Sequence, residues 1–149
     1  MSRTFVLLAQ IALWPATVAL ADEKDTALKG PLEGVWKLSS VLLNAQPLPM
    51  ETLKDARLDV QGAKYALTLA ETRLVMSHKL FADQRPKAMD LTVIEGQDKG
   101  KTFHAIYRLE GDTLTVCRSL EPGKNRPTEF ASKPDSGLLL VVWSRKSSP

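Results

Sequence analysis

The chain has 149 residues, a formal net charge of +3 at pH 7 and one cysteine. Acidic and basic residues are interspersed, without a long run of like charge or a basic stripe, so the composition does not indicate a nucleic-acid-binding protein. A single cysteine cannot form an internal disulfide, and stability must come from packing. Cys117 could be a reactive thiol or part of an intermolecular bridge, but we interpret it as a small buried residue at a strand end.

Residues 1–21 have the features of a secretory signal peptide. Arg3 supplies positive charge, an apolar run covers 5–13, Pro15 breaks it, and Ala19-Leu20-Ala21 is a small-residue cleavage site. The run is shorter than the roughly 20 apolar residues of a membrane span. We therefore expect an exported protein, periplasmic or secreted, without stable membrane insertion after cleavage. The predicted mature chain begins at Asp22, which the intact mass of the exported protein tests; retention of the apolar run would contradict it.

Removing 21 of the 149 residues leaves 128, enough for one domain with a core of its own. Residues 22–33 are predicted to be a polar lead-in segment, since Gly30-Pro31 prevents a long helix. A strand then opens at Gly34, and further strands are predicted at 57–60, 64–69, 73–81, 87–95 and 138–145. The connection over 44–55 has room for a short helix after Pro49. The domain is predicted to cover 34–146.

The clearest strand signal is the hairpin over 101–117. Phe103, Ala105, Tyr107 and Leu109 alternate with more polar positions, which is the period of a half-buried strand. Gly111 supplies a turn residue that adopts positive φ easily, and the alternation resumes after it.

Eight short strands with tight connections predict an up-and-down antiparallel barrel, in which closure removes both sheet edges. A two-sheet sandwich is the alternative. The last strand, 138–145, is apolar on both faces, so its outer face is predicted to be covered by the amino-terminal segment.

Six stretches along the chain resemble the lipocalin-like domain family of planctomycete bacteria. They are GVWKL (34–38), PKAMDLT (86–92), GKT (100–102), IYRLEGDTLTVC (106–117), RPTEF (126–130) and SGLLLVVWSR (136–145). The chain departs from the family at Ala105, where glycine is frequent, and at His104, where an apolar residue is common. The resemblance implies a lipocalin-type barrel and no particular activity; small hydrophobic ligands are an expectation by analogy with lipocalins in general.

In such a barrel, the two longest connections, 44–55 and 120–137, lie at the same end, which we take as the mouth. Trp36 and Arg145 lie near the other end, on strands that must be neighbours if the barrel closes. Arg145 is predicted to cover the Trp36 ring and to close the barrel floor by a cation–π contact. Both residues are interpreted as structural.

The mouth is predicted to be basic. It gathers Arg73, Lys101, His104, Arg118, Lys124 and Arg126 against Glu95, Asp98 and Glu129. This balance favours an anionic head group whose tail lies in the barrel, with His104, Arg118, Arg126 and Glu129 as candidate ligand-binding residues. The alternative is that these charges keep the rim solvated, or that Arg126 and Glu129 hold the long link across the mouth. Phe130 is expected to pack inward.

The sequence contains no motif of catalysis, cofactor binding or metal binding. His78 and His104 lack metal-ligand spacing, and His78 shares an apolar face, which is typical of a hydrogen-bonded core histidine. We therefore expect no enzyme. Two hypotheses remain: a carrier of a small amphipathic or anionic ligand, and a filled barrel that acts as a structural or protein-interaction module with an unidentified partner.

Overall fold

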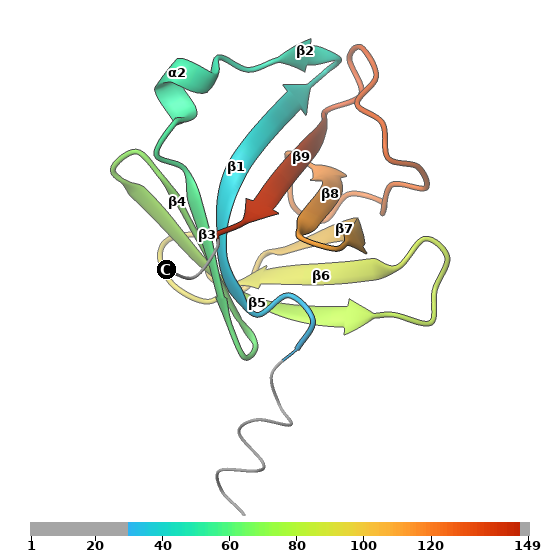
Figure 1. Ribbon diagram of the computed structural model, residues 1–149. Helices are drawn as coiled ribbons and strands as arrows, with labels where there is room; N and C mark the ends of the chain where they lie inside the picture. Colours follow the sequence, from blue (N-terminus) through green and yellow to red (C-terminus); the bar gives the residue numbers. More distant parts are fainter. Residues whose placement is uncertain (1–29, 147–149) are drawn as a thin grey trace, which may run out of the picture.

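The computed structural model describes residues 30–146, which form a closed antiparallel barrel (Figure 1). Its eight strands are β1 (Gly34–Leu43), β3 (Arg57–Gln61), β4 (Lys64–Leu69), β5 (Thr72–Phe81), β6 (Ala88–Val93), β7 (Thr102–Glu110), β8 (Thr113–Ser119) and β9 (Leu138–Arg145). Each strand pairs with the next, and β1 pairs with β9 from Trp36–Arg145 to Leu43–Leu139. The predicted up-and-down barrel is therefore confirmed, and the sandwich is not formed.

Two small elements lie in the connection after β1. The strand β2 (Gln46–Pro47) extends the sheet beyond β1, and the helix α2 (Met50–Leu53) follows Pro49. A two-residue strand is too short to leave a periodic pattern in the sequence. Among residues 30–146, no helix is long and apolar enough to cross a membrane. The predicted signal peptide and most of the predicted lead-in lie outside the described residues.

The barrel interior is filled from the alternating positions that the sequence marks as apolar. The largest fully buried side chains on these positions are Trp36, Leu58, Met76, Met89, Leu91 and Leu114. At about 25 cal/mol per Å² of apolar surface removed from water, this interior supplies the main stabilising term. Burial of these apolar side chains also fixes which face of each strand points inward. It therefore determines whether a polar side chain on a strand points into the barrel or away from it.

The floor of the barrel is closed by Arg145 and Trp36. The Arg145 guanidinium carbon lies 4.2 Å from the centre of the Trp36 ring, and Arg145 donates hydrogen bonds to the carbonyls of Glu33 and Pro31. Gly34 is required beside them, because its φ is +131° and a Cβ there would lie 3.1 Å from Arg145 Nη1. One arginine thus ties the end of β9 to the segment that enters β1.

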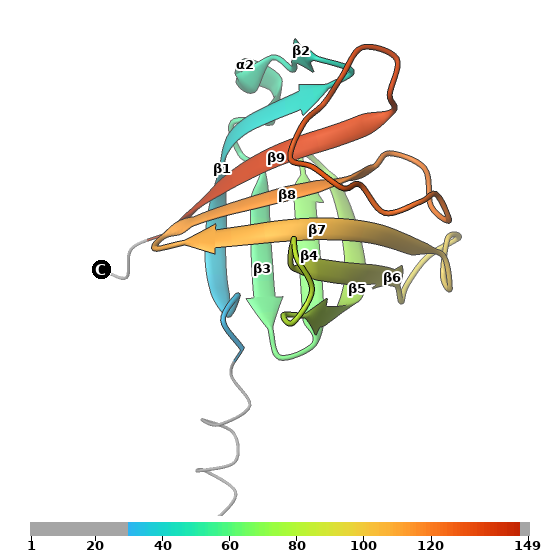
Figure 2. The same ribbon diagram turned by 90° about the vertical axis from the view of Figure 1, so that its right-hand side faces the viewer.

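The long link over 120–137 lies on the outside of the barrel and does not cross its mouth. Figure 2 shows it passing over the outer face of the sheet near β8 and β9. The ring centre of Phe130 lies 4.5 Å from the guanidinium carbon of Arg108, which points outward from β7. In addition, Cys117 Sγ donates a hydrogen bond to the carbonyl of Ala131 at 3.5 Å. The expectation that Phe130 packs inward is therefore wrong.

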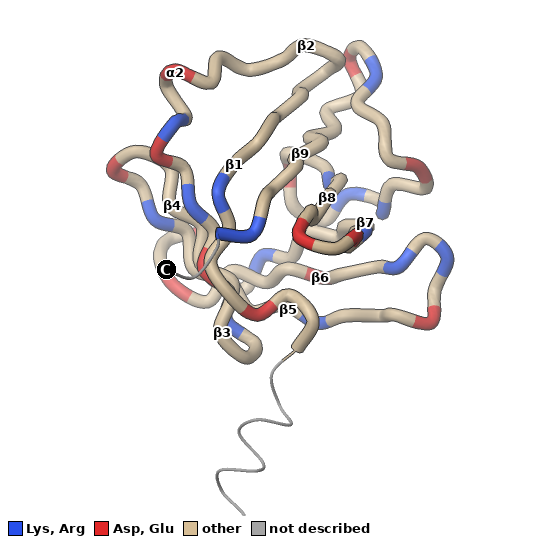
Figure 3. Tube along the Cα trace, in the orientation of Figure 1, with Lys and Arg blue, Asp and Glu red and all other residues tan. Residues whose placement is uncertain are grey.

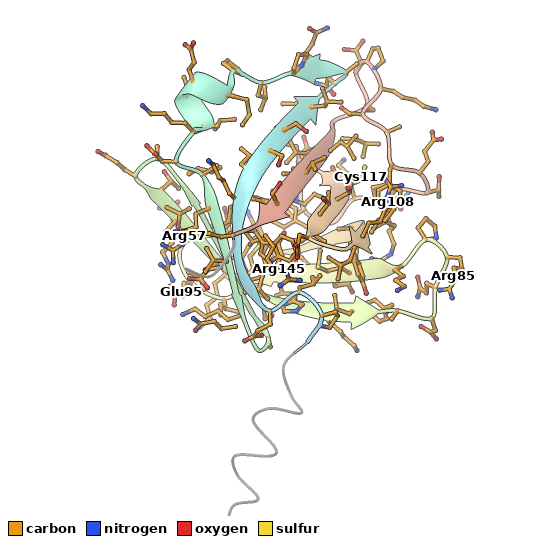
Figure 4. All side chains as sticks on the ribbon, viewed as in Figure 1. Arg57, Arg85, Glu95, Arg108, Cys117 and Arg145 are labelled. Atoms are coloured by element: carbon orange, nitrogen blue, oxygen red, sulfur yellow. The ribbon has the colours of Figure 1, made fainter. Side chains whose placement is uncertain are left out.

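This cover explains two buried residues that point away from the barrel interior. Ile106 and Cys117 face each other across β7 and β8 and are 1% and 0% exposed. Cys117, labelled in Figure 4, is a free and buried cysteine, as the sequence indicates. The predicted cover of β9 by the amino-terminal segment falls largely on residues that the structure does not describe; in the described part, Ser132 of the link donates to the carbonyl of Leu138.

Candidate functional site

An apolar cavity of about 220 Å³ occupies the mouth half of the barrel. Most of its wall is aliphatic or aromatic, and three lining residues, Tyr65, Arg118 and Trp143, carry a polar group on the side chain. The wall consists of Leu38, Val41, Leu43, Leu48, Leu53, Tyr65, Leu67, Leu69, Met76, Val116, Arg118, Leu120, Leu139, Val141 and Trp143. Leu48 and Leu53 come from the connection that holds β2 and α2, so this connection forms part of the rim.

Arg118 places a guanidinium group in this wall. It follows Leu114 and Val116 at the inward-facing positions of β8, and its guanidinium carbon lies 4.5 Å from the centre of the Phe103 ring. Its Nη1 donates to the carbonyl of Ser119 at 3.1 Å. Among residues 30–146, no carboxylate lies within ion-pair distance of it. Burial lowers the pKa of Arg118, against a smaller opposing effect of Tyr65, but an arginine stays protonated in proteins.

Tyr65 provides the second polar group of the cavity. The side chain is 4% exposed, and burial raises its pKa to about 12, although the positive charge of Arg118 acts in the opposite direction. The hydroxyl is therefore protonated at neutral pH and can donate a hydrogen bond. The site thus combines a fixed cation and a neutral donor inside an apolar wall.

His104 and Arg126 lie on the outer face, away from this cavity. Asp90 Oδ1 accepts hydrogen bonds from His104 Nδ1 at 2.9 Å and from Arg126 Nη2 at 2.7 Å. Arg126 Nη1 also donates to the carbonyls of Met89 and Ala105, at 3.1 and 2.9 Å. Burial alone would raise the pKa of Asp90, but the hydrogen bonds and charges of His104 and Arg126 outweigh it and lower the pKa. Arg126 therefore fastens the link to β6 and β7.

Several of the other predicted rim charges, Glu129, Lys101, Asp98 and Lys124, have partners on the surface. Glu129 pairs with Lys133 at 2.7 Å, and both side chains are more than half exposed. Lys101 pairs with Asp98, and Lys124 pairs with Glu121. Of the four candidate ligand-binding residues, Arg118 lines the cavity, whereas His104, Arg126 and Glu129 do not.

The cavity wall contains residues that the sequence analysis did not name as a site. Tyr65 is the most important of them, and strand alternation brings Tyr65 and Arg118 into one interior. The same alternation separates Arg118 from His104, since His104 shares the outward face of β7 with Ile106. The alternation along each strand therefore indicates which residues line the cavity. Position near the mouth is a weaker indication.

His78 lies beside the turn between β3 and β4. Its Nδ1 is 3.1 Å from the carbonyl oxygen of Ala63, and its ring centre lies 6.0 Å from that of Tyr65. Burial lowers the pKa of His78, and this effect is larger than the opposing effect of the Ala63 hydrogen bond. In the described part of the chain, no three His, Cys, Asp or Glu residues are grouped so that they could hold a metal ion.

Comparison of the chain with protein-family models, with curated proteins and with solved structures finds no match. The class of protein is therefore defined by the structure itself. It is an eight-stranded, up-and-down antiparallel barrel of the lipocalin type, with a small apolar cavity and one arginine in its wall.

Proposed function

We propose that this protein is an exported, non-enzymatic lipocalin-like carrier that binds a small amphipathic molecule with an acidic end group inside the barrel. The observation that supports the proposal is Arg118, a cation in an aliphatic cavity with no acidic partner among the described residues. The resemblance of the sequence to the planctomycete lipocalin-like family supports the same class of protein.

The energetics of Arg118 favour an anionic ligand. Arg118 is partly buried, and withdrawing a charge from water is costly when the charge is not paired. The contact with Phe103 returns about 0.5–2 kcal/mol, and one hydrogen bond to a carbonyl leaves most guanidinium N–H groups without a protein acceptor. A carboxylate would accept two of these N–H groups and neutralise the charge. Tyr65 could donate to the same carboxylate.

The size of the cavity limits the ligand. The volume of about 220 Å³ is below the roughly 300–1,000 Å³ of pockets for drug-sized ligands. The leucine wall suits an alkyl chain. A medium-chain monocarboxylate such as decanoate is therefore the ligand class that we propose.

Arg118→Met tests this proposal, because methionine keeps an unbranched stem and removes the charge. Decanoate should bind the parent protein and lose roughly 10- to 100-fold in affinity for the variant, as expected for a hydrogen bond to a charged group of about 1.5–3 kcal/mol. Decanol, which has no charge, should bind both proteins about equally. Isothermal titration calorimetry measures all four affinities, and the melting temperature of each ligand-free protein shows that the variant is folded.

A filled-barrel interaction module is the second candidate function, and the small volume of the cavity favours it. In that case neither decanoate nor decanol should bind the parent protein at any soluble concentration. If a folded Arg118→Met protein loses the same affinity for decanoate as for decanol, the protein is still a carrier with a ligand in its cavity. That result would contradict the proposed role of the arginine.

A further inference from the structure

A second concave surface lies outside the barrel, where β1, the start of β3 and the end of β9 meet. This groove has a volume of about 560 Å³. Its lining contains five basic residues and one acidic residue; the basic ones are Lys37, Lys54, Arg57, Arg145 and Lys146, and the acidic one is Asp55. Figure 3 shows blue segments below α2 in this region, and Figure 4 labels Arg57 and Arg145 on either side of β1.

The register of the sheet places Lys37 at the centre of the groove. Lys37 pairs with Arg57 on β3 and with Ser144 on β9, and side chains of paired residues point to the same face. Lys146 lies next to this row, since its backbone N–H bonds the carbonyl of Val35. Lys54 approaches from the segment that follows α2. Basic side chains from three separate parts of the chain therefore surround one point.

The protein balances only part of the charge in this groove. Like charges directly opposite each other on neighbouring strands are destabilising, and Lys37 and Arg57 are such a pair. Asp59 pairs with Arg57 at 3.0 Å, and Asp112 pairs with Arg145 at 3.4 Å. Lys37, Lys54 and Lys146 have no ion pair within residues 30–146. An anion at this point would remove the repulsion and gain several charge-assisted hydrogen bonds.

We propose that this groove binds a phosphate monoester dianion, either free or as the head group of a lipid. A compact dianion fits cations that converge on one point better than an extended acidic chain does. The lining also offers the hydroxyl of Ser144, which is hydrogen-bonded to the hydroxyl of Ser39 at 2.6 Å. The proposal does not depend on a ligand in the barrel, because the groove and the barrel cavity have no lining residue in common.

Nitrogen–proton NMR spectra of the mature protein test this inference at low ionic strength, with chloride as the matched salt. Glycerol 3-phosphate should produce saturable shifts confined to amides of 35–37, 54–57 and 144–146. Lys37→Gln should weaken this binding at least tenfold, and Lys99→Gln, which changes an exposed lysine on a different loop, should leave it unchanged. The decanoate affinity of Lys37→Gln should equal that of the parent protein.

Vesicles of phosphatidylcholine with and without phosphatidic acid distinguish the two sources of the phosphate. If the protein co-sediments only with the acidic vesicles and Lys37→Gln does not, the bound phosphate is a lipid head group. If glycerol 3-phosphate binds saturably and the vesicles do not bind, the ligand is a free phosphate ester. Shifts that do not saturate, or that are the same in Lys37→Gln, together with no Lys37-dependent vesicle binding, would overturn the proposal.

Discussion

Replacement of Arg145 by alanine is expected to lower the free energy of unfolding by about 2–4 kcal/mol, because the variant loses the cation–π contact and charged hydrogen bonds together. The contact with Trp36 is short, at 4.2 Å, and the carbonyls of Pro31 and Glu33 lose their donor. Removal of this side chain also leaves Trp36, which is 0% exposed, beside a void at the barrel floor. Urea denaturation of the two proteins measures the difference.

Two controls separate the geometry of Arg145 from its charge. Arg145→Lys keeps the charge but cannot reproduce the planar stacking and the forked donors, so it should recover only part of the loss. Arg73→Ala removes an exposed arginine from β5 and should change stability by less than about 0.5 kcal/mol. A loss below about 0.5 kcal/mol for Arg145→Ala would contradict the closure of the floor by this pair.

Replacement of Arg126 by alanine should release the link over 120–137 from the outer face. Arg126 donates to the carbonyls of Met89 and Ala105 and to the carboxylate of Asp90, so we expect a loss of about 1.5–3 kcal/mol in the free energy of unfolding. Local opening of the link would also expose Cys117, which is buried beneath it. The rate of thiol labelling under native conditions should therefore rise, at least tenfold.

Lys124→Gln is the matched control for this prediction. Lys124 belongs to the same link, but its exposed pair with Glu121 at 3.4 Å should contribute little. Unchanged Cys117 labelling in Arg126→Ala would show that other contacts hold the link. Decanoate affinity should be the same in the parent, Arg126→Ala and Lys124→Gln proteins, because neither residue lines the cavity.

The barrel could be predicted from the sequence because its strands alternate and its turns are short. In the hairpin of β7 and β8, one alternating run, a turn at Gly111 and a second run determine both strands and their register. Strand bounds agree to within two residues for most elements; β6, for example, begins at Ala88 and ends at Val93, inside the expected range.

The course of the long link could not be predicted in the same way. Residues 120–137 contain no alternation that would tie them to a face of the sheet, and chain connectivity fixes only the end of the barrel at which they begin and end. The link packs on the outside because Ile106 and Cys117 leave apolar surface there, and because Arg126 finds three acceptors on β6 and β7. Such contacts join residues far apart in sequence.

Only part of the candidate site could be predicted from the sequence. Arg118 is on the inward face of β8, but the selection of His104, Arg126 and Glu129 rested on their position near the mouth and not on their strand face. An arginine on an inward face together with Leu114 and Val116 is the informative pattern, since a charge in that position requires a partner.

The most direct test of the proposed function is the position of a bound ligand. In an NMR spectrum of the protein with decanoate, nuclear Overhauser effects should connect the alkyl chain to methyl groups of Leu67, Leu69 and Met76, and the side-chain N–H signals of Arg118 should shift. The same spectrum with Arg118→Met should lose the preferred orientation of the chain. Decanoate contacts on the outer face beside His104 and Arg126, with no effect on Arg118, would contradict a carboxylate site inside the barrel.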